Sequence, residues 1–301
     1  MTAINKLQGS IQGSKFFAGH TGVVDKRVEI SFDIIVKDSN PNGDPDRDNE
    51  PRTDSMTEEG LITGECMKSK IRAYLGEEHP DTKLLLVRGM ESLEDALKTA
   101  GPHLDYYDVR TFGAVLAVKE KEDDKASDKG KDKSSKKGKE KNIYTGAIQM
   151  SLGKSVGPVR IEETTITRGF STKSGTDKTR TMGRRKRVVF GVYHQSIWVN
   201  PAMARKNNFT WEDLELFLEA LRGAFAYDKS TARPDIKPLR VVVFEHSSSL
   251  GDCSDETTLV RATPTRINPD KHYAESLEDF DMKIREENIP GTVKATLWEY
   301  R

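Results

Sequence analysis

The sequence predicts an α+β fold whose main elements follow the order strand, helix, strand, strand, helix, strand. Two amphipathic helical segments stand between stretches in which apolar residues alternate with polar ones. This βαββαβ order is the ferredoxin-like arrangement that RNA-recognition domains also use. A third observation is a long basic segment between two strand-like stretches, which predicts an extended β-hairpin.

The first strand is predicted over residues 28–36, where every second residue is apolar. The chain then enters a loop, residues 37–54, that is dense in Asn, Pro, Gly and Asp, and turn residues of this kind fix a shape without a hydrophobic core. Its acids begin like a calcium loop at Asp44. Asn49 stands at the required glycine position and Ser55 at the position of the bidentate Glu, which excludes an EF-hand site.

The first helix is predicted within the segment of residues 61–75, with Thr63 as its N-cap and Glu65 in the first turn. Lys68 and Arg72 are four residues apart beside its apolar face, and Lys70 flanks the other side. These cations extend from a core helix into solvent or contact phosphate groups, and the pattern alone leaves both interpretations open.

The remaining elements follow from periodicity and capping patterns. Thr210 and Asp213 have capping-box spacing at the start of the second main helix, residues 210–225, and a short helix is predicted over residues 92–98. Gly113 marks a bulge or a close backbone approach. Strands are predicted over residues 108–118, 142–152, 159–165, 188–199, 239–246, 257–262 and 292–300.

Two segments lack the composition of a folded core. Residues 119–141 consist almost entirely of Lys, Asp, Glu, Ser and Gly, which predicts a disordered charged insertion. Residues 1–25 predict a flexible N-terminal extension that lacks the apolar region of a signal peptide. We therefore expect residues 26–301 to form a single domain with insertions.

Composition excludes several classes of function. The chain carries 48 basic and 48 acidic residues, so its net charge of zero argues against a general nucleic-acid coat while allowing a local basic groove. Cys66 and Cys253 do not form a C-x-x-C pair, and no histidines have metal-ligand spacing. We therefore expect a cytoplasmic protein without a membrane span, a metal, a cofactor or catalytic residues.

The strongest functional signal is the segment RGFSTKSGTDKTRTMGRRKR, residues 168–187, in which Asp177 is the one acid among many cations. Such a hairpin exposes positive charge and little apolar surface, so a phosphate backbone is the expected partner, since each contact releases a counterion. A solvated basic loop without a ligand is the alternative.

Several short motifs occur together in one order along residues 28–265. They are NPNGDP (40–45), PR (51–52), GLIT (60–63), KSKIR (68–72), YTG (144–146), GPV (157–159), TITR (165–168), TMGR (181–184) and DLEL (213–216). As a set they resemble the major backbone subunit of the CRISPR Cascade surveillance complex, the Cas-seven family, and most closely its type I-C (Dvulg) members.

The resemblance implies a hand-shaped protein with an RRM-like palm and a β-hairpin thumb, residues 166–189. Copies of it stack head to tail as a helical filament along one CRISPR RNA, hold its phosphates, and leave its bases free to pair with a target DNA strand. Further partners are the other Cascade subunits, namely the capping or RNA-processing subunit and the large and small subunits.

The resemblance also implies a set of RNA-binding residues. Phe170 or Met182 is expected to be the apolar side chain that displaces a base, by analogy with side chains that stack on single strands. The full expected set comprises Asn40, Asn42, Arg52, Lys68, Arg72, Arg168, Phe170, Arg180, Met182, Arg184 and Arg185. The alternative is a metal-dependent RNA-cleaving subunit that uses an acid of the loop between Asp38 and Asp48.

Overall fold

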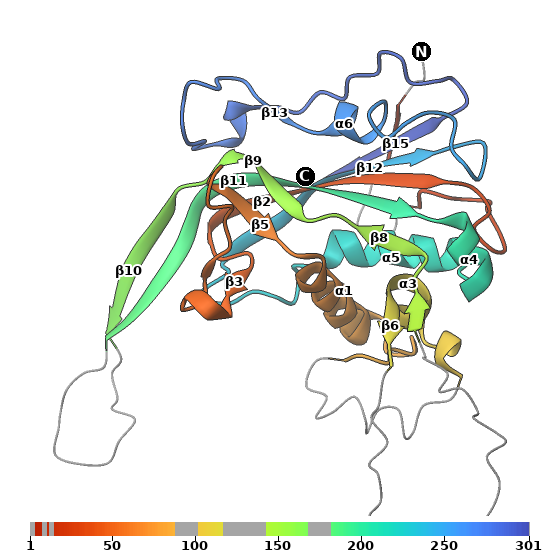
Figure 1. Ribbon diagram of the computed structural model, residues 1–301, viewed down its shortest axis with the longest axis horizontal. Coiled ribbons are helices and arrows are strands. Elements are labelled where there is room, and N and C mark those ends of the chain that lie inside the picture. The colour runs from red at the N-terminus through yellow and green to blue at the C-terminus, as the bar shows by residue number, and fades with distance from the viewer. Residues whose placement is uncertain are drawn as a thin grey trace, which may run out of the picture.

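The computed structural model describes residues 4–7, 11, 15–87, 102–116, 143–167 and 182–300. Its centre is a mixed nine-stranded sheet in the order β1-β15-β12-β2-β11-β9-β5, with β8 and β10 also paired to β11 (Figure 1). The strands are β1 (Asn5–Lys6), β2 (Val28–Ser39), β5 (Glu59–Ile62), β8 (Ile148–Met150), β9 (Gly153–Pro158), β10 (Ile161–Thr167), β11 (Met182–Val199), β12 (Asp235–Glu245) and β15 (Lys294–Glu299).

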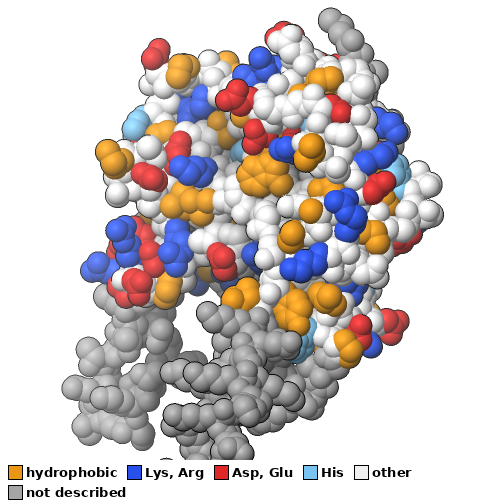
Figure 2. Space-filling model, turned by 45° about the vertical axis from the view of Figure 1, so that its right-hand side comes forward, with side chains coloured by type: hydrophobic (Ala, Val, Ile, Leu, Met, Phe, Trp, Pro, Cys, Tyr) orange, Lys and Arg blue, Asp and Glu red, His pale blue; other side chains and the backbone are white. Residues whose placement is uncertain are grey.

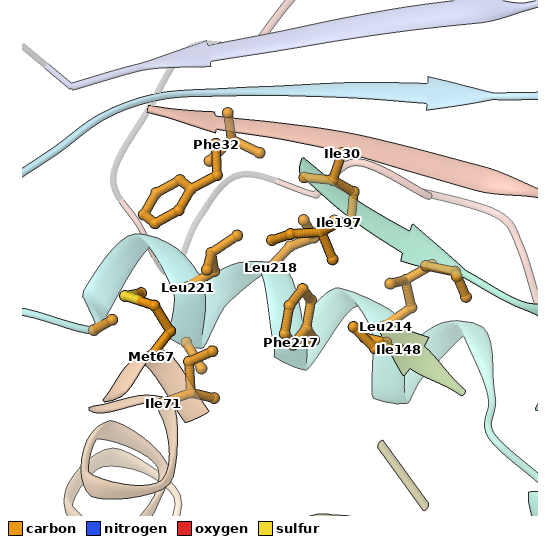
Figure 3. Close-up of a cluster of buried hydrophobic side chains, with 14 of the residues drawn as sticks. Ile30, Phe32, Met67, Ile71, Ile148, Ile197, Leu214, Phe217, Leu218 and Leu221 are labelled. Atoms are coloured by element: carbon orange, nitrogen blue, oxygen red, sulfur yellow. The ribbon is translucent and has the colours of Figure 1, made fainter. Parts of the chain in front are cut away.

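Two helices cover one face of this sheet. Helix α1 (Gly64–Glu78) follows β5, and helix α5 (Trp211–Gly223) follows the short helix α4 (Pro201–Asn207). Side chains of β2 and β11, such as Ile30, Phe32 and Ile197, point toward both helices and meet Met67 and Leu218 there (Figure 3). The strand predicted over residues 28–36 and both main helices are confirmed, because their periodic apolar faces form this core.

Helix α1 begins as its sequence predicts. Thr63 has an extended backbone, and its hydroxyl accepts a hydrogen bond from the N–H of Cys66 at 3.2 Å. The cap satisfies one of the N–H groups that a helix leaves without a partner in its first turn. Asn42 joins the same corner, because its Oδ1 accepts from the N–H of Thr63 at 2.9 Å.

Replacing Thr63 with Ala is expected to lower the free energy of unfolding by about 1 kcal/mol, the usual effect of removing an N-cap hydroxyl. Thr63→Ser keeps the hydroxyl, so its free energy of unfolding should stay within about 0.3 kcal/mol of that of the unmodified chain. Urea denaturation followed by circular dichroism measures both. Equal losses in the two variants would mean that the methyl group, and not the cap, matters at this position.

The opposite face of the sheet carries the C-terminal cover, which we define as residues 246–293 (Figure 1). It holds helix α6 (Leu259–Ala262), strands β13 (Thr265–Arg266) and β14 (Phe280–Asp281), and the 3-10 helix η3 (Leu277–Asp279). Phe190 and Val192 of β11 pack against Ala274 and Phe280 of the cover. The described sheet is therefore covered on both faces.

A buried charged group fixes the cover to the sheet. Arg240 of β12 is 1% exposed, and its guanidinium donates to the carboxylate of Asp33 and to the backbone carbonyls of Met282 and Ala262. Asp33 is fully buried and also contacts His194 Nδ1 at 2.8 Å. Burial of a charge in a core is tolerated only where partners of this kind surround it.

The prediction of a strand over residues 108–118 is wrong for its first half. Residues Tyr107–Phe112 form helix α3, preceded by the 3-10 helix η2 (His103–Asp105), and only Gly113–Val115 (β6) pairs as a strand, with β7 (Ile143–Thr145). Gly113 has φ +77°, and a Cβ there would lie 2.2 Å from the carbonyl oxygen of Tyr144, so the close approach predicted for it is real.

Two further strand predictions need correction. The strand over residues 257–262 is wrong, because Leu259–Ala262 is the helical turn α6 of the cover. The strand over 142–152 is divided at Gly146, where a Cβ would lie 2.3 Å from the backbone of Phe112. The helix predicted over 92–98 and the insertion over 119–141 lie outside the described residues.

Residues 15–25, within the segment expected to be a flexible extension, pack onto the domain. Phe17 is 6% exposed beside Trp211, and the carboxylate of Glu215 accepts from the N–H groups of Phe16 and Phe17 at 2.9–3.0 Å. Both cysteines are free thiols. No helix within the described ranges combines the length and the apolar character needed to span a membrane.

Candidate nucleic-acid interface

The basic segment forms the end of a hairpin that projects from the sheet. β10 and β11 pair antiparallel from Ile161↔Val188 to Thr167↔Met182, and the pair leaves the body of the domain (Figure 1). Arg168, Phe170 and Arg180 lie outside the described residues. Met182 is the first residue of β11, and only its backbone is described.

The cations at the base of the hairpin are held by neighbouring groups. Arg184 is 77% exposed and lies 3.3 Å from Glu163, its cross-strand diagonal neighbour. Arg185 Nη1 donates to the carbonyl of Thr231 at 3.1 Å. Lys186 Nζ lies 2.9 Å from Glu50. Basic and acidic side chains therefore alternate beside the grey atoms at the lower left of Figure 2.

The loop after β2 lies opposite these cations. It contains strands β3 (Gly43–Asp44) and β4 (Glu50–Pro51), which pair with each other, and the 3-10 helix η1 (Pro45–Arg47) between them. Asp48 and Asn49 have positive φ, at +50° and +60°, which explains why Asn and Asp stand there. A Cβ on Gly43 would lie 1.8 Å from Asn49 Oδ1, so a larger residue here would have to displace the Asn49 side chain.

Loop and hairpin enclose a depression of roughly 410 Å³ that we call the hairpin groove. Its most buried member is Asn40, 3% exposed, whose side-chain NH2 donates to the carbonyl of Asn49 at 2.6 Å. The groove is lined by Asn40, Asp48, Asn49, Gly183, Arg184, Arg185, Lys186 and Ala232. Three consecutive cations on one wall make it a place where phosphate groups bind favourably.

Asn42 and Arg52 lie on the other side of the loop. Asn42 lines a second cavity of roughly 400 Å³, between α1 and residues 224–233. Lys70 also lines it, 8% exposed and ion-paired with Asp228, so this cation is not on the helix surface as the sequence suggested. Arg52 Nη2 lies 3.4 Å from Asp44.

Lys68 and Arg72 face helix α3 and not the hairpin groove. Arg72 Nε donates to Asp108 at 2.9 Å, and its guanidinium stands 5.3 Å from the centre of the Phe112 ring. Lys68 Nζ lies 5.9 Å from the same ring. Asp108 is fully buried and accepts from two further backbone N–H groups, so it holds Arg72 in place. The structure thus brings Asn40, Arg184 and Arg185 together and places Lys68 and Arg72 elsewhere.

Two acids of the loop named for RNA cleavage, Asp38 and Asp44, are engaged by arginines. Asp38 lies 3.4 Å from Arg187, and Asp44 lies 3.4 Å from Arg52. No group of three His, Cys, Asp or Glu side chains arranged to hold a metal ion occurs among the residues described. Sequence reasoning missed Lys186 and Glu50 as a pair, because they are 136 residues apart and only the folded loop brings them together.

Comparison with known proteins identifies a family. The family model described as "CRISPR-associated protein Cas7" matches residues 26–285. A Haloferax volcanii protein named CRISPR-associated protein Cas7 is 30% identical over 210 residues, which is 63% of this chain and 61% of that protein. The chain thus spans about 61% of the length of this curated relative.

Two solved structures have a similar arrangement of elements. One belongs to a CRISPR RNA-guided surveillance complex, with a TM-score of 0.44 and 16% identity over 72% of this chain and 68% of that one. The other belongs to such a complex in a pre-nicking state, with a TM-score of 0.46 and 15% identity over 72% of this chain and 75% of that one.

Proposed function

Because the chain belongs to the Cas7 family of CRISPR-associated proteins, we propose that it is a non-catalytic backbone subunit of a type I-C RNA-guided surveillance complex. It holds CRISPR RNA by the phosphates and leaves the bases free to pair with target DNA. The observation that carries this proposal is the hairpin groove, which Arg184, Arg185 and Lys186 line together with residues of the loop after β2.

The sheet order supports an RRM-like palm over residues 26–301. In the run β12-β2-β11-β9 every neighbouring pair is antiparallel, α1 lies between β2 and β9 in the chain, and α5 lies between β11 and β12. This is the connectivity expected of a ferredoxin-like domain. The projecting β10–β11 pair supports the proposed thumb, residues 166–189, of which residues 168–181 lie outside the described part of the chain.

The C-terminal cover bears on where RNA binds. Single-stranded RNA stacks on the open sheet face of an ordinary RRM, but here Phe190 of that face is 6% exposed beneath Phe280. RNA therefore runs past the hairpin groove and the thumb instead of across the sheet. Such a path grips phosphates without reading base edges, as a guide that must stay readable requires.

The proposal includes further copies of the chain and the other subunits as partners. The thumb of one copy contacts the palm of the next copy, so each interface joins two different surfaces of the chain. Repeating such an interface generates a head-to-tail filament. The capping or RNA-processing subunit and the large and small subunits then bind its ends and sides.

Replacing Arg184 and Arg185 together with Ala is expected to weaken binding of single-stranded RNA about tenfold at 0.1 M salt, whatever its sequence, because two phosphate contacts are lost. The slope of log K against log salt should become shallower by about 1.4 for the same reason. Fluorescence anisotropy over a salt series measures both quantities.

The matched control replaces Arg205 and Lys206 of α4 together with Ala, which removes two exposed cations at the other end of the domain. Its affinity should stay close to that of the unmodified chain. Size and absorbance of the protein as purified give a second test, since a filament subunit should carry RNA in a large particle. Unchanged affinity in the variant of Arg184 and Arg185, or a monomer free of nucleic acid, contradicts the proposal.

A further inference from the structure

The cations of the hairpin base that the structure describes already have anionic or carbonyl partners. Lys186 is the most informative of them. Its Nζ lies 2.9 Å from Glu50, and both side chains are about one third exposed, at 32% and 28%. The pair joins two elements far apart in the sequence, because Lys186 lines the hairpin groove and Glu50 directly follows Asn49, which also lines it.

Glu50 is held where it stands by backbone structure. It belongs to β4 and pairs with Asp44 of β3, and Lys186 pairs with Glu163 across the hairpin. The hydrogen bond from Lys186 to Glu50, with the nearby charges of Glu163 and Asp48, raises the pKa of the lysine. The carboxylate of Glu50 thus occupies a position beside a cation of the groove that a phosphate oxygen would also favour.

We infer that Glu50 is a built-in counter-anion of the hairpin groove, which occupies Lys186 until a polyanion with enough further contacts displaces it. The inference rests on the proposed function and deepens it, because it makes Glu50 a residue that sets how tightly the groove holds a polyanion. A short or weakly held polyanion gains little at Lys186, since the existing pair must first be broken. A strand that also engages Arg184 and Arg185 gains enough elsewhere to displace Glu50.

The inference predicts that Glu50→Gln tightens binding of polyanions at the hairpin groove, because Lys186 is then released from its ion pair. At about 4 Å, one unit charge in water is worth about 1 kcal/mol, which corresponds to about a fivefold change in affinity. We expect this gain for a 30-nucleotide polyuridine RNA and for inorganic polyphosphate, each measured by competition in fluorescence anisotropy at 0.15 M salt. The gain should shrink at 0.5 M salt.

Glu256→Gln is the matched control, because it makes the same change in net charge at an exposed position. Glu256 lies at the far end of β2 from the hairpin. It is two residues before Thr258, whose hydroxyl donates to Glu29 near the start of β2. The other end of β2 reaches the hairpin, where Ser39 pairs with Val188. Ten residues of strand separate the two ends by about 33 Å, several Debye lengths at this salt. Its affinity should remain within about 1.5-fold of the unmodified chain.

A double variant shows whether Glu50 acts through Lys186. Adding Lys186→Gln to Glu50→Gln should remove the fivefold gain, because the released cation is then missing. The inference is overturned if Glu50→Gln gives no gain, if Glu256→Gln gives an equal gain, or if the gain survives the loss of Lys186. The polyphosphate measurement stands whether or not the chain binds RNA, so failure of the proposed function remains distinguishable.

Discussion

Replacing Arg240 with Met is expected to lower the free energy of unfolding by about 3–5 kcal/mol, the effect of removing one partner from a buried ion pair. The substitution leaves the carboxylate of Asp33 without its main partner in the core. It also removes the donor to the carbonyls of Met282 and Ala262, which fasten the C-terminal cover to the sheet. Urea denaturation followed by tryptophan fluorescence measures the loss.

Two companion variants show whether the loss comes from the unpaired charge. Arg205→Met removes an exposed arginine from α4 and should change stability by less than about 0.5 kcal/mol. Asp33→Leu combined with Arg240→Met removes both charges and should recover much of the stability that the single variant loses. A loss below about 1 kcal/mol for Arg240→Met would mean that the cover does not depend on this arginine.

Replacing Asp108 with Ala is expected to lower the free energy of unfolding by about 3 kcal/mol, because several buried donors lose their acceptor at once. Asp108 accepts from the N–H groups of Leu85 and Leu86 at 2.8 and 3.0 Å and from Arg72 at 2.9 Å. It therefore joins residues 85–86, helix α3 and helix α1. Thermal and urea unfolding of the variant measure the loss.

Asp108→Asn is the control, since it keeps one acceptor oxygen while removing the charge, and its loss should be smaller. Variants at this ion pair also separate two roles of Arg72, anchoring helix α3 and binding RNA. If Arg72 mainly anchors α3, Arg72→Met should lower stability and leave RNA affinity nearly unchanged at a temperature where the variant is fully folded. An Asp108→Ala variant that keeps its stability but loses RNA affinity would contradict the anchoring role.

The periodic parts of the fold follow directly from the sequence. Alternation over residues 28–36 and the capping patterns at Thr63 and Thr210 predict β2, α1 and α5, because each has one apolar face and a local start signal. The hairpin is also predicted, since β10 and β11 flank a segment too polar to be buried. The short apolar runs near Val109 and Leu259 look like strands but form helical turns. A run this short has no clear period, so packing against the rest of the domain decides its conformation.

The candidate site is predicted in outline and not in detail. Arg184 and Arg185 stand out by composition, whereas the pairing of Arg72 with Asp108 and of Lys70 with Asp228 arises from contacts between distant segments. A helical pattern shows that a cation lies beside an apolar face, but it cannot show which neighbouring helix or loop supplies an acid. The role of Glu50 has no local signal for the same reason.

The length of β11 has a mechanical consequence. One strand of 18 residues runs from the projecting hairpin into the middle of the sheet, and Val188 is the residue at which both ladders meet, paired with Ile161 on one edge and Ser39 on the other. Protein hinges normally use loop or end residues that absorb large changes in φ and ψ. Since no loop interrupts β11, a force on the hairpin is transmitted along this strand as twist and as shear between β2 and β11. Movement of the hairpin is therefore coupled directly to the central sheet.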